Sequence, residues 1–238
     1  MQEAISAHMC TQQRWDAAGM PQEAASAHVC TQPQTPAEYI AQLPRWDGRP
    51  RLNTWLRRVT SAPNSPMSPE TAMAGRHLIL SMTARAMQPG CKVDQTVLLI
   101  GPAACGKTRI LQALAGDWYS NSNLLDDPTP GALLKGNWLQ ELEASYLHAD
   151  SLHRFKSFLS TTVDTYRLPY HKETNSDPRL ATLVLTAQYI PTWWHAEGEQ
   201  RHVLTHTFTR RSPDMTQLFA IRDQLFAEAK HELQRGVQ

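Results

Sequence analysis

The predicted fold depends on the stretch Leu98-Leu99-Ile100-Gly101-Pro102-Ala103-Ala104-Cys105-Gly106-Lys107-Thr108. It fits the pattern G-x-x-x-x-G-K-[S/T], which cradles phosphate when it joins a strand to a helix. Gly101 and Gly106 allow a tight turn that brings backbone N–H groups against phosphate oxygens. The predicted nucleotide-binding residues are Gly101, Pro102, Ala103, Ala104, Cys105, Gly106, Lys107, Thr108 and Arg109.

Two side chains at the end of this loop are predicted to meet the nucleotide and its metal. Lys107 carries a positive charge to the β- and γ-phosphates, and the Thr108 hydroxyl ligates Mg²⁺. The helix expected from Lys107 to about Leu114 directs its positive N-terminal end at the anion. The predicted cofactors are therefore ATP and Mg²⁺.

Composition sets outer limits on the function. The chain has 238 residues and a net charge of +1, from 23 basic and 22 acidic residues, so any nucleic-acid surface must be local. No apolar run has membrane-spanning length, and the N-terminus lacks the pattern of a signal peptide. The four cysteines form no C-x-x-C pair, which predicts free thiols in a reducing cytoplasm.

Residues 1–34 are expected to form a loosely ordered arm. The segment 2–12 recurs as 22–32 with two differences, which indicates a tandem duplication. An alternative interpretation is a metal site, because the repeats contain zinc-ligand residue types. Its candidate ligands are His8, Cys10, His28 and Cys30.

Residues 35–92 are predicted to form a helical subdomain. Thr35 and Pro36 carry the signals of a helix start, with Glu38 completing a capping box, and further helices are expected over 53–59 and 70–87. Residues 45–58 contain five arginines and two tryptophans. Such a mixture either binds nucleic acid or forms a small platform whose tryptophans pack inward.

Residues 93–238 are predicted to form a P-loop ATPase core that ends in a long helix over 215–234. Strands are expected at 93–100, 137–143, 180–186 and 202–208, and residues 117–119 are expected to begin a further short strand after the loop helix. Glu141 is one of the acids toward the end of the 137–143 strand, where a carboxylate can hold the Mg²⁺ water shell or orient the attacking water. The alternative for Glu141 is a solvated acidic turn. The end of the 180–186 strand would present Gln188 to the nucleotide.

With these pieces in place, the chain from Glu38 to Gly236 resembles the virulence-associated protein E family of phages and mobile elements. The resemblance rests on several short sequence motifs in addition to the loop. These are Tyr39-Ile40, Leu43-Pro44-x-Trp46-Asp47-Gly48-x-Pro50-Arg51-Leu52, Pro89-Gly90-Cys91-Lys92-Val93-Asp94, Trp138-Leu139-x-Glu141-Leu142, Phe155-Lys156-x-Phe158-Leu159, Asp164-x-Tyr166-Arg167-x-Pro169-Tyr170, Pro178-Arg179 and Arg222-Asp223-Gln224-Leu225.

The resemblance implies a P-loop NTPase with an AAA-related, superfamily III helicase-like, three-layer α/β core that works as a homo-oligomeric ring. It implies ATP-driven action on DNA, mainly single-stranded, in replication of the element, with a primase or other replication proteins as partners. Glu141 would take the Walker B role, Arg167 and Arg179 would be arginine fingers or phosphate contacts, and Arg201 would be sensor-like. Surface salt bridging is the alternative for the arginines.

The chain also departs from the family pattern. Gln188 stands where an asparagine is usual. Arg201 is the single arginine of a motif that usually has two, and the second acid after the Walker B position is displaced to Glu143. These departures favour an alternative function, a nucleotide-dependent binding or regulatory module with weakened hydrolysis. A small-molecule kinase is disfavoured, because the acids and arginines follow the helicase-like order.

Overall fold

The computed structural model describes residues 35–62, 65–124, 127, 129–147, 149–167, 173–195 and 202–236. From residue 35 onward they belong to one compact unit. The predicted arm of residues 1–34, with its repeats and candidate metal ligands, lies outside the described residues. In the part of the chain that the structure describes, no helix is long and apolar enough to cross a membrane.

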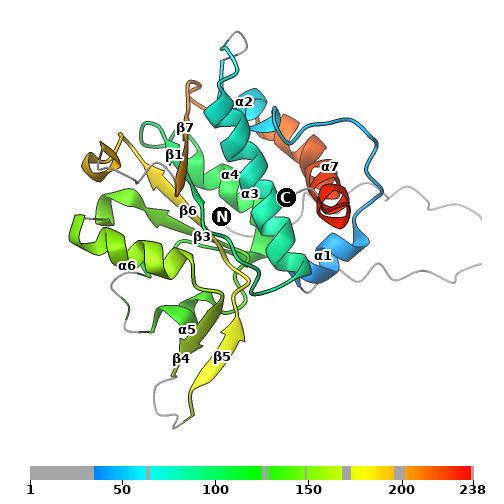
Figure 1. Cartoon of the computed structure of the whole chain (residues 1–238). Coiled ribbons are helices and arrows are strands. Elements are labelled where there is room, and N and C mark those ends of the chain that lie inside the picture. The colour runs from blue at the N-terminus through cyan, green and yellow to red at the C-terminus, as the bar shows by residue number, and fades with distance from the viewer. Residues whose placement is uncertain are drawn as a thin grey trace, which may run out of the picture. The chain divides into compact units, whose positions relative to one another are not determined.

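A five-stranded parallel sheet forms the centre of the fold (Figure 1). Its strand order is β2-β3-β6-β1-β7, so β6 separates β1 from β3. β1 and β6 are buried along their whole length, as parallel strands are when helices cover both faces. The strands are β1 (Thr96–Ile100), β2 (Tyr119–Ser120), β3 (Leu139–Glu143), β6 (Thr182–Ala187) and β7 (Val203–Thr207).

Helices cover both faces of the sheet and give three layers (Figure 1). Because side chains alternate along a strand, Val97 and Leu99 pack into one apolar core while Leu98 and Ile100 pack into the other. The predicted α/β class is confirmed. The first core contains residues of α1 (Pro36–Gln42), α2 (Trp55–Thr60), α3 (Pro69–Met87), α4 (Lys107–Ala115) and α7 (Met215–Gln234); the second contains residues of α5 (Pro130–Leu134) and α6 (Ala149–Leu159). Short 3₁₀ turns occupy Gly116–Trp118, Ala144–Tyr146 and Thr192–His195.

The helices of residues 35–92, predicted as a helical subdomain, share one apolar core with α4 and α7. Trp55 of α2 is fully buried and donates its indole N–H to the Gly75 carbonyl of α3 at 2.9 Å. Trp138, next to β3, donates to the Met82 carbonyl of α3 at 2.7 Å. The first contact joins α2 to α3, and the second ties α3 to the sheet. Thr35 caps α1 as predicted, because its hydroxyl accepts from the Glu38 N–H at 3.2 Å.

An antiparallel hairpin, which the sequence did not predict, lies between α6 and β6. It consists of β4 (Val163–Tyr166) and β5 (Asn175–Pro178), and it projects beyond the sheet (Figure 1). Val163 is exposed while Asp164 is buried, the reverse of the usual apolar-in alternation. Because of this inversion, the hydrophobic periodicity of the sequence does not predict β4.

Candidate functional site at the carboxyl edge of the sheet

The Gly101–Thr108 loop joins β1 to α4 in a conformation that requires its glycines. Gly106 has φ of 92°, in the left-handed region, and a Cβ there would lie 2.5 Å from Pro213 Cδ. A Cβ on Gly101 would lie 2.8 Å from Cys105 Sγ. The loop therefore has the strand–turn–helix context that the sequence predicted and leaves no room for larger residues at either glycine.

Lys107 is held by its own loop. Its ammonium group donates to the Gly101 carbonyl at 2.7 Å and to the Pro102 carbonyl at 3.1 Å. The N–H groups of Lys107, Thr108 and Arg109 lie in the first turn of α4, where backbone donors have no partner within the helix. This helix start is suited to bind an anion.

The Glu141 carboxylate joins the loop to two other parts of the sheet. Its Oε1 accepts from the Thr108 hydroxyl at 2.9 Å and from the Thr186 hydroxyl of β6 at 2.8 Å. Its Oε2 accepts from the Tyr119 hydroxyl of β2 at 2.5 Å. With neighbouring strands about 4.8 Å apart, β6 holds β3 roughly 10 Å from β1, and the helix start at Thr108 spans that gap. Glu141 is only 7% exposed, so it is not a solvated acidic turn.

Burial, followed by the hydrogen bond to Glu141, raises the pKa of Tyr119 above its ordinary range, so this phenol stays a donor. Tyr119 is therefore a site residue that the sequence analysis missed. The only available signal was its place in a short predicted strand after the loop helix. Position in a strand does not reveal which side chain will point at the carboxylate.

A cavity of about 330 Å³ opens beside Glu141. Its polar lining consists of hydroxyl, amide and carboxylate side chains, the ligand types that Mg²⁺ takes in proteins. The register places Glu143 opposite Thr186 at the same edge of the sheet. The site can therefore accept a hard cation next to an anion held by the loop. The polar lining residues are Thr108, Asn121, Ser122, Asn123, Glu141, Glu143 and Thr186.

Arg179 does not reach this cavity in the way expected of an arginine finger. Its side chain is completely buried and pairs with Asp164 of β4. Its guanidinium also donates to the Phe158 carbonyl and lies 4.2 Å from the centre of the Phe158 ring. A side chain enclosed in this way cannot touch a nucleotide bound to a neighbouring subunit, so the expected phosphate contact does not fit this structure.

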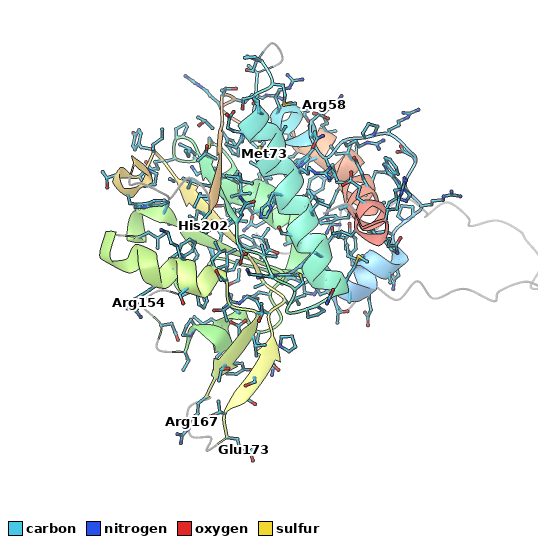
Figure 2. All side chains as sticks on the ribbon, viewed as in Figure 1. Arg58, Met73, Arg154, Arg167, Glu173 and His202 are labelled. Carbon is cyan, nitrogen blue, oxygen red and sulfur yellow. The ribbon has the colours of Figure 1, made fainter. Side chains whose placement is uncertain are left out.

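The remaining predicted residues lie in different places. Arg167 is exposed at the distal end of β4, far from the sheet (Figure 2). Gln188 is exposed directly after β6, at the same edge as the loop. Arg201 lies outside the described residues. The structure thus brings together Thr108 and Glu141 but leaves Arg167 apart from them within one chain.

Two further arginines lie in the segment Phe208–Asp214, which joins β7 to α7 and contacts the loop. Phe208 lies 3.0 Å from a Cβ built on Gly101, and Pro213 abuts Gly106, so the segment touches the loop near both ends. Arg211 is exposed, and Arg210 lies 3.9 Å from Asp214. The sequence signal was the Arg-Arg pair just before the Pro-Asp start of α7.

A family model described as the virulence-associated protein E-like domain matches residues 40–238. The chain belongs to this family. Two solved structures of an NrS-1 C-terminal region in its A form without ligand are similar, at TM-scores of 0.51 and 0.47 and identities of 13% and 11%. The matches cover 79% and 67% of this chain but 46% and 42% of those chains.

At 13% identity the first of these structures shows a similarity of fold alone, and the chain spans less than half the length of either neighbour. No curated protein matches the chain.

Proposed function

We propose that this virulence-associated protein E-like chain binds ATP with Mg²⁺ at the Gly101–Thr108 loop and hydrolyses it. Its core would then be an AAA-related, superfamily III helicase-like P-loop NTPase that acts on DNA in replication of a phage or other mobile element. The observation that carries this proposal is the 2.9 Å hydrogen bond between Thr108 and Glu141. It joins the hydroxyl of a phosphate-loop residue to a carboxylate of β3 that is separated from it by 33 positions in the sequence.

Each part of the site has a task in such a reaction. The loop N–H groups and the start of α4 bind the phosphates, and Lys107 exchanges its two carbonyl partners for phosphate oxygens. Thr108 and Glu141 would hold Mg²⁺, which when bound neutralises charge that develops on the phosphates. Tyr119 and Thr186 keep the Glu141 carboxylate in place when the Thr108 hydroxyl turns to the metal.

Assembly into a ring is part of the proposal. The exposed Arg167 lies away from the loop of its own chain, so its contact with a nucleotide would be made in a neighbouring subunit. Arg211 would be the nearby cation within the same chain. Single-stranded DNA, a primase or other replication proteins, and a bacterial cytoplasm are the partners and location that the family resemblance implies.

The test is ATP turnover by the purified chain, with and without single-stranded DNA. Lys107→Ala should lower turnover by about 100-fold or more, the usual cost of losing a group that stabilises transition-state charge. Lys92→Ala is the matched control, because Lys92 is exposed, pairs with Asp94 at 2.9 Å and precedes β1 at the opposite edge of the sheet. Equal turnover by the two variants would rule out hydrolysis at this loop.

A second candidate is a binding module that takes up ATP without turning it over. The enclosed Arg179 favours it, because one expected transition-state cation is committed to Asp164. Calorimetry should then detect ATP binding that Lys107→Ala abolishes, while phosphate release stays at the level of the buffer. Phosphate release by the wild type that Lys107→Ala removes would exclude this candidate.

A further inference from the structure

A second hollow, of about 380 Å³, lies between the loop that follows α1 and the C-terminal half of α7. We call it the α1–α7 hollow. Its volume lies within the range of sites for small ligands or parts of larger ones. Its lining includes Arg45, Trp46, Gly48, Lys230 and His231.

The loop wall of the hollow is held firmly by side chains of α7. Gln224 accepts from the Asp47 N–H at 2.9 Å and donates to the Arg45 carbonyl at 3.4 Å. Glu228 accepts from the backbone N–H groups of Arg51 and Leu52, at 2.7 and 3.2 Å. The shape of the hollow is therefore present before any ligand arrives, which reduces the entropy lost on binding.

The chemistry of the hollow is aromatic and cationic. The half-buried Trp46 packs at 5.0 Å between ring centres against His231, and its indole N–H donates to the Arg49 carbonyl. Arg45 and Arg49 are exposed. Of the two acids at this loop, Asp47 forms a salt bridge of 2.6 Å with Arg51, and Glu228 accepts from the backbone N–H groups of Arg51 and Leu52.

Lys230 donates to the carbonyls of Ile40 and Ala41 at the end of α1, at 2.8 and 3.4 Å. An ammonium group has three hydrogens, so one remains for a ligand.

The structure also divides the basic and aromatic stretch of residues 45–58. Trp55 is fully buried and serves the core, as the inward-packing alternative predicted. Trp46 and the arginines beside it line or border the hollow instead. Trp55 thus follows the inward-packing interpretation, and the nucleic-acid interpretation concerns only the half of the stretch around Trp46.

We propose that the α1–α7 hollow binds single-stranded DNA, with a base against Trp46 and the backbone phosphates beside Arg45, Arg49 and Lys230. Aromatic side chains next to cations form a common type of single-strand site, because bases stack on rings and phosphates pair with the charges. The proposal shares its DNA with the proposed function but does not depend on ATP hydrolysis.

The experiment measures binding of a fluorescein-labelled oligo(dT) to the full chain by fluorescence anisotropy, without nucleotide, over a series of salt concentrations. Arg45→Gln should weaken binding and lower the slope of log K against log salt by about 0.7, the value for one lost phosphate contact. Arg58→Gln is the matched control, because Arg58 is an exposed arginine on α2 (Figure 2), and it should leave both quantities unchanged.

Trp46→Ala should weaken binding by roughly tenfold, as expected for one lost stacking contact, while Trp46→Phe should keep most of the affinity. Melting curves check that each variant folds. Equal affinity and salt slope for Arg45→Gln and Arg58→Gln would overturn the proposal. So would a hollow that bound a protein partner while the Arg45 and Trp46 variants kept the DNA affinity of the wild type.

The DNA-binding test of the hollow can succeed or fail independently of the ATP turnover test of the proposed function. Lys107→Ala should bind the oligonucleotide as the wild type does, because the hollow needs no ATP. DNA binding that depends on Arg45 in a protein without ATP turnover would refute the proposed hydrolysis and support the hollow. Turnover with no dependence of DNA binding on Arg45 would do the reverse.

Discussion

The buried pair of Arg179 and Asp164 gives the sharpest prediction about stability. The Arg179 side chain is 0% exposed and that of Asp164 is 7% exposed, and Arg179 Nε lies 3.0 Å from each carboxylate oxygen. Asp164→Asn keeps the shape of the side chain but removes the charge that compensates the guanidinium. Breaking one partner of a buried pair costs about 3–5 kcal/mol of unfolding free energy.

At about 2–4 °C per kcal/mol for a chain of this size, the melting temperature should fall by roughly 6–20 °C. Arg179→Met should fall comparably, since it leaves a buried carboxylate alone. The double variant Asp164→Leu/Arg179→Met should recover most of the loss, because an apolar pair needs no compensation. Circular dichroism measures the melting temperatures, and turnover is measured per folded molecule below the transition.

A different result would refute this reasoning. If Arg179→Met kept the wild-type melting temperature but lost ATP turnover, the guanidinium would contact the nucleotide during catalysis. The buried pair with Asp164 would then not be its conformation in the active protein. Turnover that stays normal in the folded fraction, together with a lower melting temperature, assigns Arg179 to the structure alone.

Four further predictions follow from individual contacts. Burial lowers the pKa of His206 to about 4, so between pH 6.5 and 4 the unfolded chain binds a proton that the folded chain does not. Stability should fall by up to about 3 kcal/mol as the pH drops through this window, and His206→Asn should flatten the change in urea midpoint. Gly106→Ala should cost about 1–3 kcal/mol and abolish ATP binding, whereas Gly116→Ala, at φ of 60° with no atom within 4 Å of its Cβ, should cost stability without affecting binding. Arg211→Gln should raise the ATP Kd in calorimetry more than Arg210→Gln does, since Arg210 already faces Asp214; equal effects would contradict the role given to Arg211. Tyr119→Phe should raise the Mg²⁺ concentration needed for half-maximal turnover, because Glu141 loses one of its three hydroxyl partners; an unchanged Mg²⁺ titration would argue against a positioning role.

Much of the fold could be predicted because its signals are local. The loop pattern, the apolar runs of β1 and β6 and the cap at Thr35 each act over a few residues, and the corresponding elements lie close to the expected ranges. The contact between Thr108 and Glu141 agrees with the expectation that an acid of this strand lies close to the loop. Parallel strands bring their carboxyl ends together, so topology was sufficient for this contact.

The rest depended on long-range packing. Arg179 has no local feature that separates an enclosed ion pair from an exposed arginine finger, because its partner Asp164 is itself a polar residue in an inverted strand. The helices of residues 35–92 look like an independent unit until the Trp138 indole, which adjoins β3, is seen to donate to α3. In each of these cases a side chain meets a partner at least 15 positions away.

The contacts of Phe208 with Gly101 and of Pro213 with Gly106 constrain how this chain can be inherited or engineered. Two short segments about 107 positions apart pack against each other. A substitution in one segment is therefore tolerated only if it fits the side chains of the other. A chimera that took its last 30 or so residues from a relative would pack different side chains against the loop, and the close packing between the two segments would be disturbed. Recombination within the family should therefore exchange these two segments together, and covariation between positions 106 and 213 is the trace that such a history would leave.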